Sequence, residues 1–476
     1  MIAKRVKLLA RALGAMACLV LVAGLLGCSA EARTAEDFRR TEAPSEGRIE
    51  VTFWHAMGGG QARSLNAIID EFNALPDNPY YVVSTYQGRY NELQQKLIAS
   101  LYAGQQPACS QMYESWVTRF LKFQCLQPVE AFIEVDPEFT REDVDDLIDS
   151  FRVDSSYPLT KTEDGYRLDY QNGETTLVTL PFNKSVYVLF VNDTLLKELG
   201  YEGPPETWDE MLEVARRMTK RDEDGNIERY GFAVRPFIEA FTPLLMSAGG
   251  NYMDHDMNEF TFANEEGQAA LEFLRQLALG EDDGRIGYVE SNYLNSPFGA
   301  GIIGMYISST ASFPFNDMAV GNKFIWRAYP MPSRDADTDG RVLAQGTNVG
   351  IFRQGYTEQS RLPDEVQLGA WEFMKFLASK EKTAQWARET GYMPVRKSAA
   401  ELPEMRAYME ENPNFANAFS SLERAEFEPA PIWWDNVRTI FQREVSAMLN
   451  QRKTAEEALE SALAKAETIR ASAGKN

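Results

Sequence analysis

Apolar and polar positions along the first part of the chain follow two spacings in turn, that of β-strands and that of amphipathic helices. Strands are predicted at residues 49–55, 80–86 and 108–113, and helices over 65–72 and 90–102. This alternation is typical of a parallel sheet covered by helices. Ligands of such sheets lie at the carboxyl ends of the strands, where Trp54, His55, Tyr90 and Glu114 are expected.

The remainder of the chain continues in the same way and ends in helices. We expect an extended apolar run at 177–192, helices at 208–218 and 267–279, a strand at 301–308, and helices at 371–377, 386–390, 439–449 and 454–469. The 301–308 strand is expected to return to the first lobe. No internal repeat with a period of about 20 to 50 residues is found.

The N-terminus has the pattern of an export signal. Four cations, Lys4, Arg5, Lys7 and Arg11, precede a stretch from Ala12 to Gly27 without any charged residue. This stretch is shorter than the roughly 20 residues that a membrane-spanning helix needs, which favours a cleaved signal over a permanent membrane-spanning segment. We therefore predict a lipoprotein signal peptide at residues 1–27.

The signal ends in Leu25-Leu26-Gly27-Cys28, which resembles a bacterial lipobox. In that motif the Cys28 thiol carries a diacylglyceryl group, and cleavage occurs just before it. Acyl chains anchor a protein stably because each buried methylene adds about 0.8 kcal/mol. Residues 28–47 are poor in large apolar side chains, so we predict a flexible tether between the anchor and the folded part.

Size and charge restrict the class of protein. The chain has 476 residues, more than a single hydrophobic core of roughly 250 to 300 residues can organise, so at least two lobes are expected. Removal of the four signal cations leaves 44 basic against 70 acidic residues, a formal charge of −26. Nucleic acid and anionic membrane surfaces are therefore excluded as expected partners.

Two cysteines of the exported part, Cys109 and Cys125, leave two alternatives open. They can form a disulfide outside the cytoplasm, or they can be two small buried apolar side chains. The sequence does not decide between these two states.

Few residues are suited to catalysis or metal binding. The chain has only two histidines, His55 and His255, and it contains no phosphate-binding glycine loop and no CxxC motif. The acidic segment Asp335–Gly340 resembles half of a calcium loop, but Gly346 occupies the place of the closing glutamate. No metal and no cofactor are expected. A secreted glycoside hydrolase with a carboxylate pair is the remaining enzymatic alternative, and no particular pair in the sequence supports it.

Six ordered motifs resemble the large carbohydrate-type solute-binding proteins of ABC importers. They are Phe53-Trp54-His55-Ala-Met57, Tyr86-Gln-Gly-Arg-Tyr90, the segment 107–114, Leu180-Pro-Phe-Asn183, Glu206-Thr-Trp208-Asp-Glu and Thr390-Gly-Tyr392-Met-Pro394. They extend from about residue 49 to the end of the chain. Within this family the likeness is greatest to members that bind sn-glycerol 3-phosphate.

The resemblance implies an α/β, two-lobed periplasmic-binding-protein fold with a ligand cleft and three hinge crossings, near Asn183, Gly304 and Gly346. It places residues 48–183 and 305–346 in an N-terminal lobe, and 184–304 and 347–476 in a C-terminal lobe. It implies a monomeric binding protein, not an enzyme, that closes on a small polar solute and delivers it to the permease subunits outside the cytoplasm. Glycerol 3-phosphate or a glycerophosphodiester and a mono- or oligosaccharide remain alternative solutes.

The resemblance also implies a set of ligand-binding residues. These are Tyr90, Glu114, Ser185, Ser309, Gly346 and Tyr392, with Trp54, Trp208, Trp433 and Trp434 as further candidates. Glu114 and the two serines suit hydroxyl or phosphate oxygens, and the aromatic rings suit a sugar ring or a cationic headgroup. Each residue also has a structural alternative: Trp54 continues an apolar strand, Trp208 begins an amphipathic helix, and the Trp433-Trp434 pair can fill a gap between lobes.

One position departs from the pattern of the phosphate-binding members. Where they carry an arginine for the phosphate, this chain has Ala430, and Arg438 is expected to belong to the helix that follows. Loss of a charge-assisted hydrogen bond of about 1.5 to 3 kcal/mol weakens the case for a phosphate.

Overall fold

The computed structural model describes residues 47–162, 165–254, 257, 259–280 and 284–473. The predicted signal peptide, the lipidation residue Cys28 and the predicted tether up to residue 46 lie outside the described residues. Within the described part, no helix combines the length and the apolar character needed to cross a membrane.

The strands form one large and one small sheet. Their bounds are β1 (Ile49–His55), β2 (Tyr80–Tyr86), β3 (Cys109–Met112), β4 (Leu126–Gln127), β5 (Ser156–Thr162), β6 (Gly165–Leu168), β7 (Glu174–Leu177), β8 (Leu180–Asn192), β9 (Lys220–Arg221), β10 (Ile227–Val234), β11 (Gly287–Val289), β12 (Ile303–Ser309), β13 (Trp326–Tyr329), β14 (Val342–Phe352) and β15 (Ala425–Glu426). The large sheet has the order β11-β10-β12-β8-β14-β3-β1-β2, and β5, β6 and β7 form the small one.

The α-helices follow the strands in chain order. They are α2 (Gly59–Asn73), α3 (Tyr90–Ala103), α4 (Glu114–Lys122), α5 (Glu130–Ile133), α6 (Arg141–Asp146), α7 (Asp149–Asp154), α8 (Asp193–Glu198), α9 (Trp208–Met218), α10 (Ile238–Ser247), α11 (Glu265–Leu279), α12 (Asn295–Gly299), α13 (Phe313–Val320), α14 (Asp364–Leu377), α15 (Lys380–Thr390), α16 (Pro403–Glu411), α17 (Pro413–Ser420), α18 (Trp434–Leu449) and α19 (Ala455–Ala473). Short 3₁₀ turns occur at Thr310–Ser312, Glu358–Ser360, Ser398–Glu401 and Ser421–Arg424.

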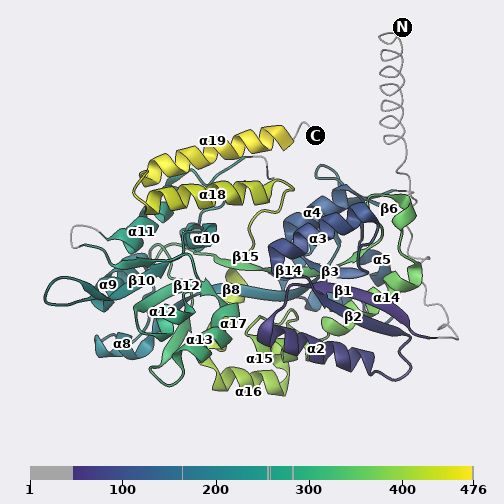
Figure 1. Ribbon diagram of the computed structural model, residues 1–476, viewed down its shortest axis with the longest axis horizontal. Coiled ribbons are helices and arrows are strands. Elements are labelled where there is room, and N and C mark those ends of the chain that lie inside the picture. Colours follow the sequence, from purple (N-terminus) through teal and green to yellow (C-terminus); the bar gives the residue numbers. More distant parts are fainter. Residues whose placement is uncertain (1–46, 163–164, 255–256, 258, 281–283, 474–476) are drawn as a thin grey trace, which may run out of the picture.

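Two parallel groups of strands are joined by two long antiparallel strands. β1 is parallel to β2 and β3, which we call the first half of the sheet, and β10 is parallel to β11 and β12, the second half. β8 is antiparallel to β14 up to Val186 and to β12 from Tyr187 onward, and β14 is antiparallel to β3. Figure 1 shows the first half in purple and blue, the second half in teal, and β8 between them.

Local sequence explains several element boundaries. The predicted strands at 49–55 and 80–86 and the predicted helix at 208–218 are confirmed with the same bounds. Thr207 and Glu210 form a capping box that starts α9, and Gly104 in the left-handed conformation (φ 66°) ends α3. These signals act within a few residues, so the sequence alone is sufficient to place them.

The path of the chain between the halves differs from the expectation at two places. The strand expected to return to the first lobe is β12, and it pairs with β10 and β8 in the second half. Gly304, expected at a hinge, lies inside this strand against Met218 of α9. Ile303 and Met305 of this strand are fully buried, and Met305 packs in the core cluster of the second half.

The helices after β14 do not form one block with the second half. Because β14 leads back to β3, the next helix, α14, packs on β1, with Gly369 against Val51 and Tyr80. α15 contacts α2, whereas α18 and α19 pack on α10 and α11 of the second half. Residues 347–476 were predicted as part of one lobe, and the packing divides them between the two halves.

Candidate ligand site at the β8–β14 crossing

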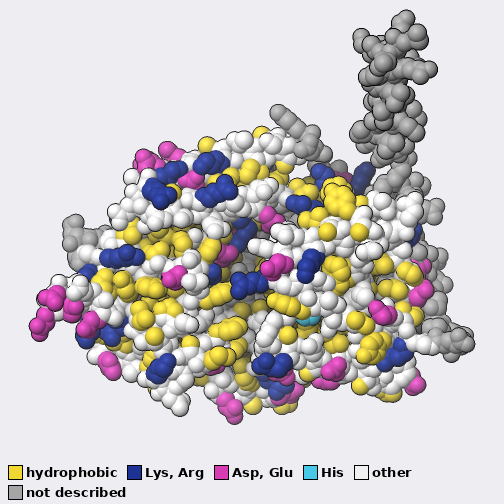
Figure 2. All heavy atoms as spheres, viewed as in Figure 1, with side chains coloured by type: hydrophobic (Ala, Val, Ile, Leu, Met, Phe, Trp, Pro, Cys, Tyr) yellow, Lys and Arg dark blue, Asp and Glu magenta, His cyan; other side chains and the backbone are white. Residues whose placement is uncertain are grey.

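The two long strands bring polar residues together in the middle of the sheet, where residues 183–185 of β8 pair with residues 345–347 of β14. We call this part of the sheet the β8–β14 crossing. Asn183, Lys184 and Ser185 on β8 lie opposite Thr347, Gly346 and Gln345 on β14. Gly346 has φ 137°, and a Cβ atom there would lie 2.1 Å from the Asn183 carbonyl oxygen, so only glycine fits this position. Figure 2 shows the face of the molecule hollowed near its centre, where acidic and basic side chains meet.

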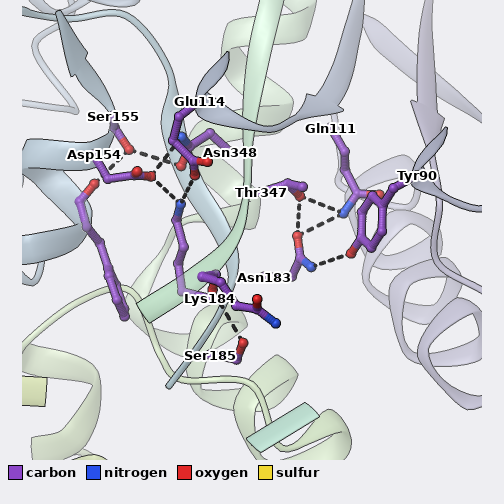
Figure 3. Close-up of polar contacts among 12 residues, drawn as sticks. Tyr90, Gln111, Glu114, Asp154, Ser155, Asn183, Lys184, Ser185, Thr347 and Asn348 are labelled. Atoms are coloured by element: carbon purple, nitrogen blue, oxygen red, sulfur yellow. Dashed lines mark hydrogen bonds and ion pairs between the residues drawn. The ribbon is translucent and has the colours of Figure 1, made fainter. Parts of the chain in front are cut away.

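A hydrogen-bonded network connects β3, β8, β14 and α3. The Asn183 amide donates to the Tyr90 hydroxyl at 2.9 Å, and the Gln111 amide donates to Asn183 at 2.9 Å and to Thr347 at 3.1 Å. Gln111, Asn183 and Thr347 are fully buried. Figure 3 shows how this network holds the Tyr90 ring at the edge of the crossing. Satisfied buried networks of this kind fix side-chain positions.

A buried lysine lies beside two carboxyl groups on the other side of β8. The Lys184 ammonium donates to Asp154 at 2.5 Å and to Glu114 at 3.4 Å, and the lysine side chain has no exposed surface. Burial, and after it the Asp154 carboxylate, raise the pKa of Glu114 well above its usual value, while Lys184 acts in the opposite direction. The raised pKa favours the protonated form of Glu114, and a protonated carboxyl can both donate and accept a hydrogen bond.

Aromatic side chains lie beside these polar groups. Tyr90 and Tyr113 meet edge to face with ring centroids 5.0 Å apart, and Tyr392 stacks on Trp386 at 5.8 Å. Burial raises the pKa of Tyr392, whose hydroxyl interacts with Asn183 and Tyr90. Rings with polar tips of this kind suit ligands that combine apolar C–H faces with hydroxyl groups.

A second charged cluster belongs to the second half of the sheet. Arg438, on the helix α18 where it was expected, pairs with Glu239 at 2.5 Å and with Glu428. Glu428 also accepts from Thr242 at 2.9 Å and from the Trp434 indole at 3.0 Å. Burial acts to lower the pKa of Arg438, but the two carboxylates outweigh it and hold the pKa above its usual value. The charges of Arg438 and Glu239 also act on the pKa of Tyr113 and of Tyr187, so both tyrosines lie near this cluster.

Six of the residues singled out from sequence lie around the crossing. Tyr90, Glu114, Ser185, Gly346 and Tyr392 are in the groups described above, and Ser309 at the end of β12 lies opposite Tyr187 of β8. Ala430 lies farther along, where its carbonyl oxygen accepts from Thr118 at 2.8 Å.

The tryptophans are distributed differently. Trp208 is buried in the second half, stacked on Phe273 at 4.5 Å with its indole N–H on Ser247, so its structural alternative holds. Trp434 is likewise a core residue, while Trp433 is half-buried against Phe260. Trp54 is half-buried on β1 and packs in the first half.

Several residues of the site were not singled out from sequence. They are Gln111, Asp154, Asn183, Lys184, Thr347, Asn348, Glu239 and Arg438 as a site residue. One signal was present: Lys184 is a charged residue inside a long apolar run, and such a residue needs a buried partner. Gln111 and Asn183 lie inside the motifs at 107–114 and 180–183 but were not predicted to bind a ligand, and the remaining residues carry no local signal.

Cys109 and Cys125 are both buried, and no disulfide joins them to each other in the structure. Of the two alternatives, the structure therefore favours two small buried side chains over a disulfide.

Comparison with known proteins gives one family and one fold. Residues 67–417 match the family model described as "Bacterial extracellular solute-binding protein". The sn-glycerol-3-phosphate-binding periplasmic protein UgpB of Escherichia coli K12 is 25% identical over 431 residues, which cover 87% of this chain and 90% of that protein.

Solved structures of binding proteins resemble this one over most of their length. UgpB from Mycobacterium tuberculosis in complex with glycerophosphocholine has a TM-score of 0.72 at 20% identity, with 89% of this chain and 98% of that chain covered. The cyclic α-maltosyl-1,6-maltose binding protein from Arthrobacter globiformis has a TM-score of 0.70 at 19% identity, with 89% and 99% covered. These likenesses show a shared fold.

Proposed function

Because the chain belongs to the family of bacterial extracellular solute-binding proteins, which bind solutes and do not catalyse reactions, we propose that it captures a small polar solute at the β8–β14 crossing for an ABC importer. The observation that supports this most directly is the group formed by Tyr90, Glu114, Ser185 and Gly346, in which hydrogen-bonding groups and an aromatic ring lie beside a close backbone approach. The polar groups can hydrogen-bond to the hydroxyl groups of a solute, and the aromatic ring can pack against its C–H face.

The charges favour a neutral sugar or polyol over a phosphate dianion. Ala430 lies where the resemblance places the phosphate arginine of the glycerol-phosphate-binding members, and Arg438 is already paired with Glu239 and Glu428. To bind a dianion, Arg438 would have to leave a carboxylate unpaired, which costs free energy in a partly buried site. We therefore place a mono- or oligosaccharide first.

A glycerophosphodiester with a cationic headgroup is the second candidate. The two carboxylates at Arg438 and the rings of Tyr113 and Tyr187 suit a quaternary ammonium, which binds to aromatic faces and to acidic groups. A relative with this fold is named for its complex with glycerophosphocholine. Such a solute carries one phosphate charge and compensates it with its own cation.

We propose that the two halves of the sheet act as lobes that close on the solute, with β8 and β14 as crossing segments near Asn183 and Gly346. The solute then acts through its higher affinity for the closed arrangement, which the permease recognises. The predicted anchor at Cys28 and the tether of residues 28–47 would keep the protein on the outer face of the membrane, within reach of the permease.

A thermal-shift screen tests this proposal. The full-length protein in detergent is heated with a panel of sugars, glycerol 3-phosphate and glycerophosphocholine. A ligand at 100 times its dissociation constant adds about 2.7 kcal/mol and raises the melting temperature. Stabilisation by sugars alone supports the first candidate, and stabilisation by glycerophosphocholine alone supports the second.

The matched variant is Glu114→Gln, which keeps the size of the side chain and removes the acid. We expect it to reduce the ligand-induced shift. If no solute of the panel stabilises the protein, or if a glycoside is hydrolysed, the proposal is wrong.

A further inference from the structure

A second cavity lies outside the polar network, between α4 and β6 on one side and residues 431–433 on the other. It has a volume of about 430 Å³, within the range of small-molecule pockets. Thr118 and Leu121 of α4 and Leu168 of β6 form one wall, and Pro431, Ile432 and Trp433 form the opposite wall.

The two walls belong to different halves of the molecule. α4 follows β3 of the first half, whereas Trp433 packs on Phe260 with ring centroids 5.6 Å apart and leads into α18 of the second half. The walls are joined by the Thr118 hydroxyl, which donates to the Ala430 carbonyl at 2.8 Å. A molecule in the cavity would therefore contact both halves.

The lining combines aromatic rings with positive charge. Trp433 is half-buried and Tyr170 is 62% exposed, so each ring has surface available to a ligand. Lys122 and Arg167 also line the cavity, and neither lies within ion-pair distance of a carboxylate in the described part of the chain, while backbone hydrogen bonds and, to a lesser extent, the charge of Arg167 lower the pKa of the exposed Asp169. No acidic side chain lines the cavity, although the chain has 70 acidic residues.

We propose that this cavity binds a sugar ring that carries an anionic group, as a binding site separate from the central one. Aromatic faces stack on the C–H face of a sugar ring, and unpaired Lys and Arg side chains bind a carboxylate or phosphate through charge-assisted hydrogen bonds. A neutral sugar would use the rings alone, and a ringless anion would use the cations alone. The combination selects a ligand that has both features.

The cavity lies one helical turn from the central site. The Thr118 hydroxyl contacts the Glu114 carbonyl oxygen at 3.2 Å, and both residues are on α4. A ligand of two or more units can reach from one site to the other, and a single unit in the cavity would favour the arrangement in which the walls are close. The inference does not depend on which solute occupies the central site.

Isothermal titration calorimetry tests whether the cavity binds anionic sugars. The full-length protein is titrated with D-glucuronate, D-glucose 6-phosphate and D-glucose. We expect the two anionic sugars to bind at least about tenfold more tightly than glucose, because each charge-assisted contact is worth about that factor. Lys122→Gln and Arg167→Gln should each weaken anionic binding by about tenfold. Both residues are exposed, so the variants are expected to fold.

Two further variants distinguish the possible outcomes. Arg443→Gln removes an exposed cation of α18 that does not line the cavity, and it should leave binding unchanged. Glu114→Gln alters the central site and should preserve binding of the anionic sugars. If both cavity variants bind the anionic sugars as the unmodified protein does, if they weaken glucose binding to the same extent, or if Glu114→Gln abolishes binding of the anionic sugars, the inference is wrong, whatever the thermal-shift screen shows for the central site.

Discussion

The Lys184 ammonium lies 2.5 Å from the Asp154 carboxylate, and neither side chain exposes more than 2% of its surface. The pair connects β8 with α7 at the point where β8 passes from one half of the sheet to the other. Asn348 of β14 donates to the same carboxylate at 3.1 Å and accepts from Ser155. The charge of Lys184 is thus compensated within the crossing itself.

Removal of Asp154 should destabilise the protein much more than neutralisation of Glu114. Asp154→Asn leaves a buried lysine without its nearest carboxylate, which costs about 3 to 5 kcal/mol. Glu114→Gln should cost much less, because Glu114 is the more distant carboxyl group, 3.4 Å from the lysine against 2.5 Å for Asp154, and its raised pKa already disfavours its charged form. Urea denaturation at pH 7 measures both unfolding free energies. Equal losses in the two variants would contradict this assignment of charge.

His55 should make stability depend on pH. Burial lowers the pKa of His55 to about 4 from its ordinary value of 6.5, and the side chain is 3% exposed. Between these values the unfolded chain binds a proton that the folded protein excludes. The contribution of His55 is therefore fully present above pH 6.5 and is lost as pH falls towards 4, by about 3 kcal/mol.

The measurement compares unfolding free energies of the unmodified protein and His55→Asn across this pH range. Asparagine keeps an acceptor for the Met57 N–H, which donates to the His55 Nδ1 atom at 3.2 Å, and it does not titrate. We expect a flatter pH dependence in the variant. Identical slopes for both proteins would show that the histidine is not responsible.

The two buried cysteines should react only after unfolding. Burial raises the pKa of the Cys109 thiol, which leaves it protonated and inert, and Cys125 is fully buried as well. With N-ethylmaleimide, intact-mass analysis should show no modification of the native protein and modification of both thiols in denaturant without reductant. Labelling that requires prior reduction would mean that the two residues form a disulfide.

Sequence patterns predicted the local structure of the site better than its long-range contacts. Strand spacing and a capping box placed β1 and α9, because those signals act between near neighbours. The motifs also placed Tyr90, Glu114 and Gly346 in the same region. Asp154 could not be predicted, because its partners Lys184 and Asn348 come from strands 30 and 194 residues away.

Trp208 illustrates the opposite difficulty. Its motif suggested a ligand contact, but its helix turns it inward onto Phe273, and this contact exists only after α9 and α11 pack together. The assignment of β12 to the first lobe was wrong for a similar reason, since a strand pattern does not specify which neighbours the strand will pair with.

Asp435 connects the two halves of the molecule through hydrogen bonds. One of its oxygens accepts from the Ser115 hydroxyl at 2.9 Å and the other from the Gln94 amide at 3.1 Å. Ser115 and Gln94 lie on α4 and α3 of the first half, whereas Asp435 lies in the first turn of α18, which packs in the second half. These hydrogen bonds exist only while the halves are close, so they stabilise the closed arrangement.

Asp435→Ala should therefore weaken solute binding by about fivefold, since two partly exposed hydrogen bonds contribute about 1 kcal/mol to closure. The unfolding free energy should change little, because neither half loses a core contact. Calorimetric affinity for the solute found in the thermal-shift screen and the radius of gyration from small-angle scattering measure the effect, and we expect a larger radius without solute. Asn436→Ala, at the exposed neighbouring position, is the matched control. Unchanged affinity and radius in Asp435→Ala would show that closure does not depend on this contact.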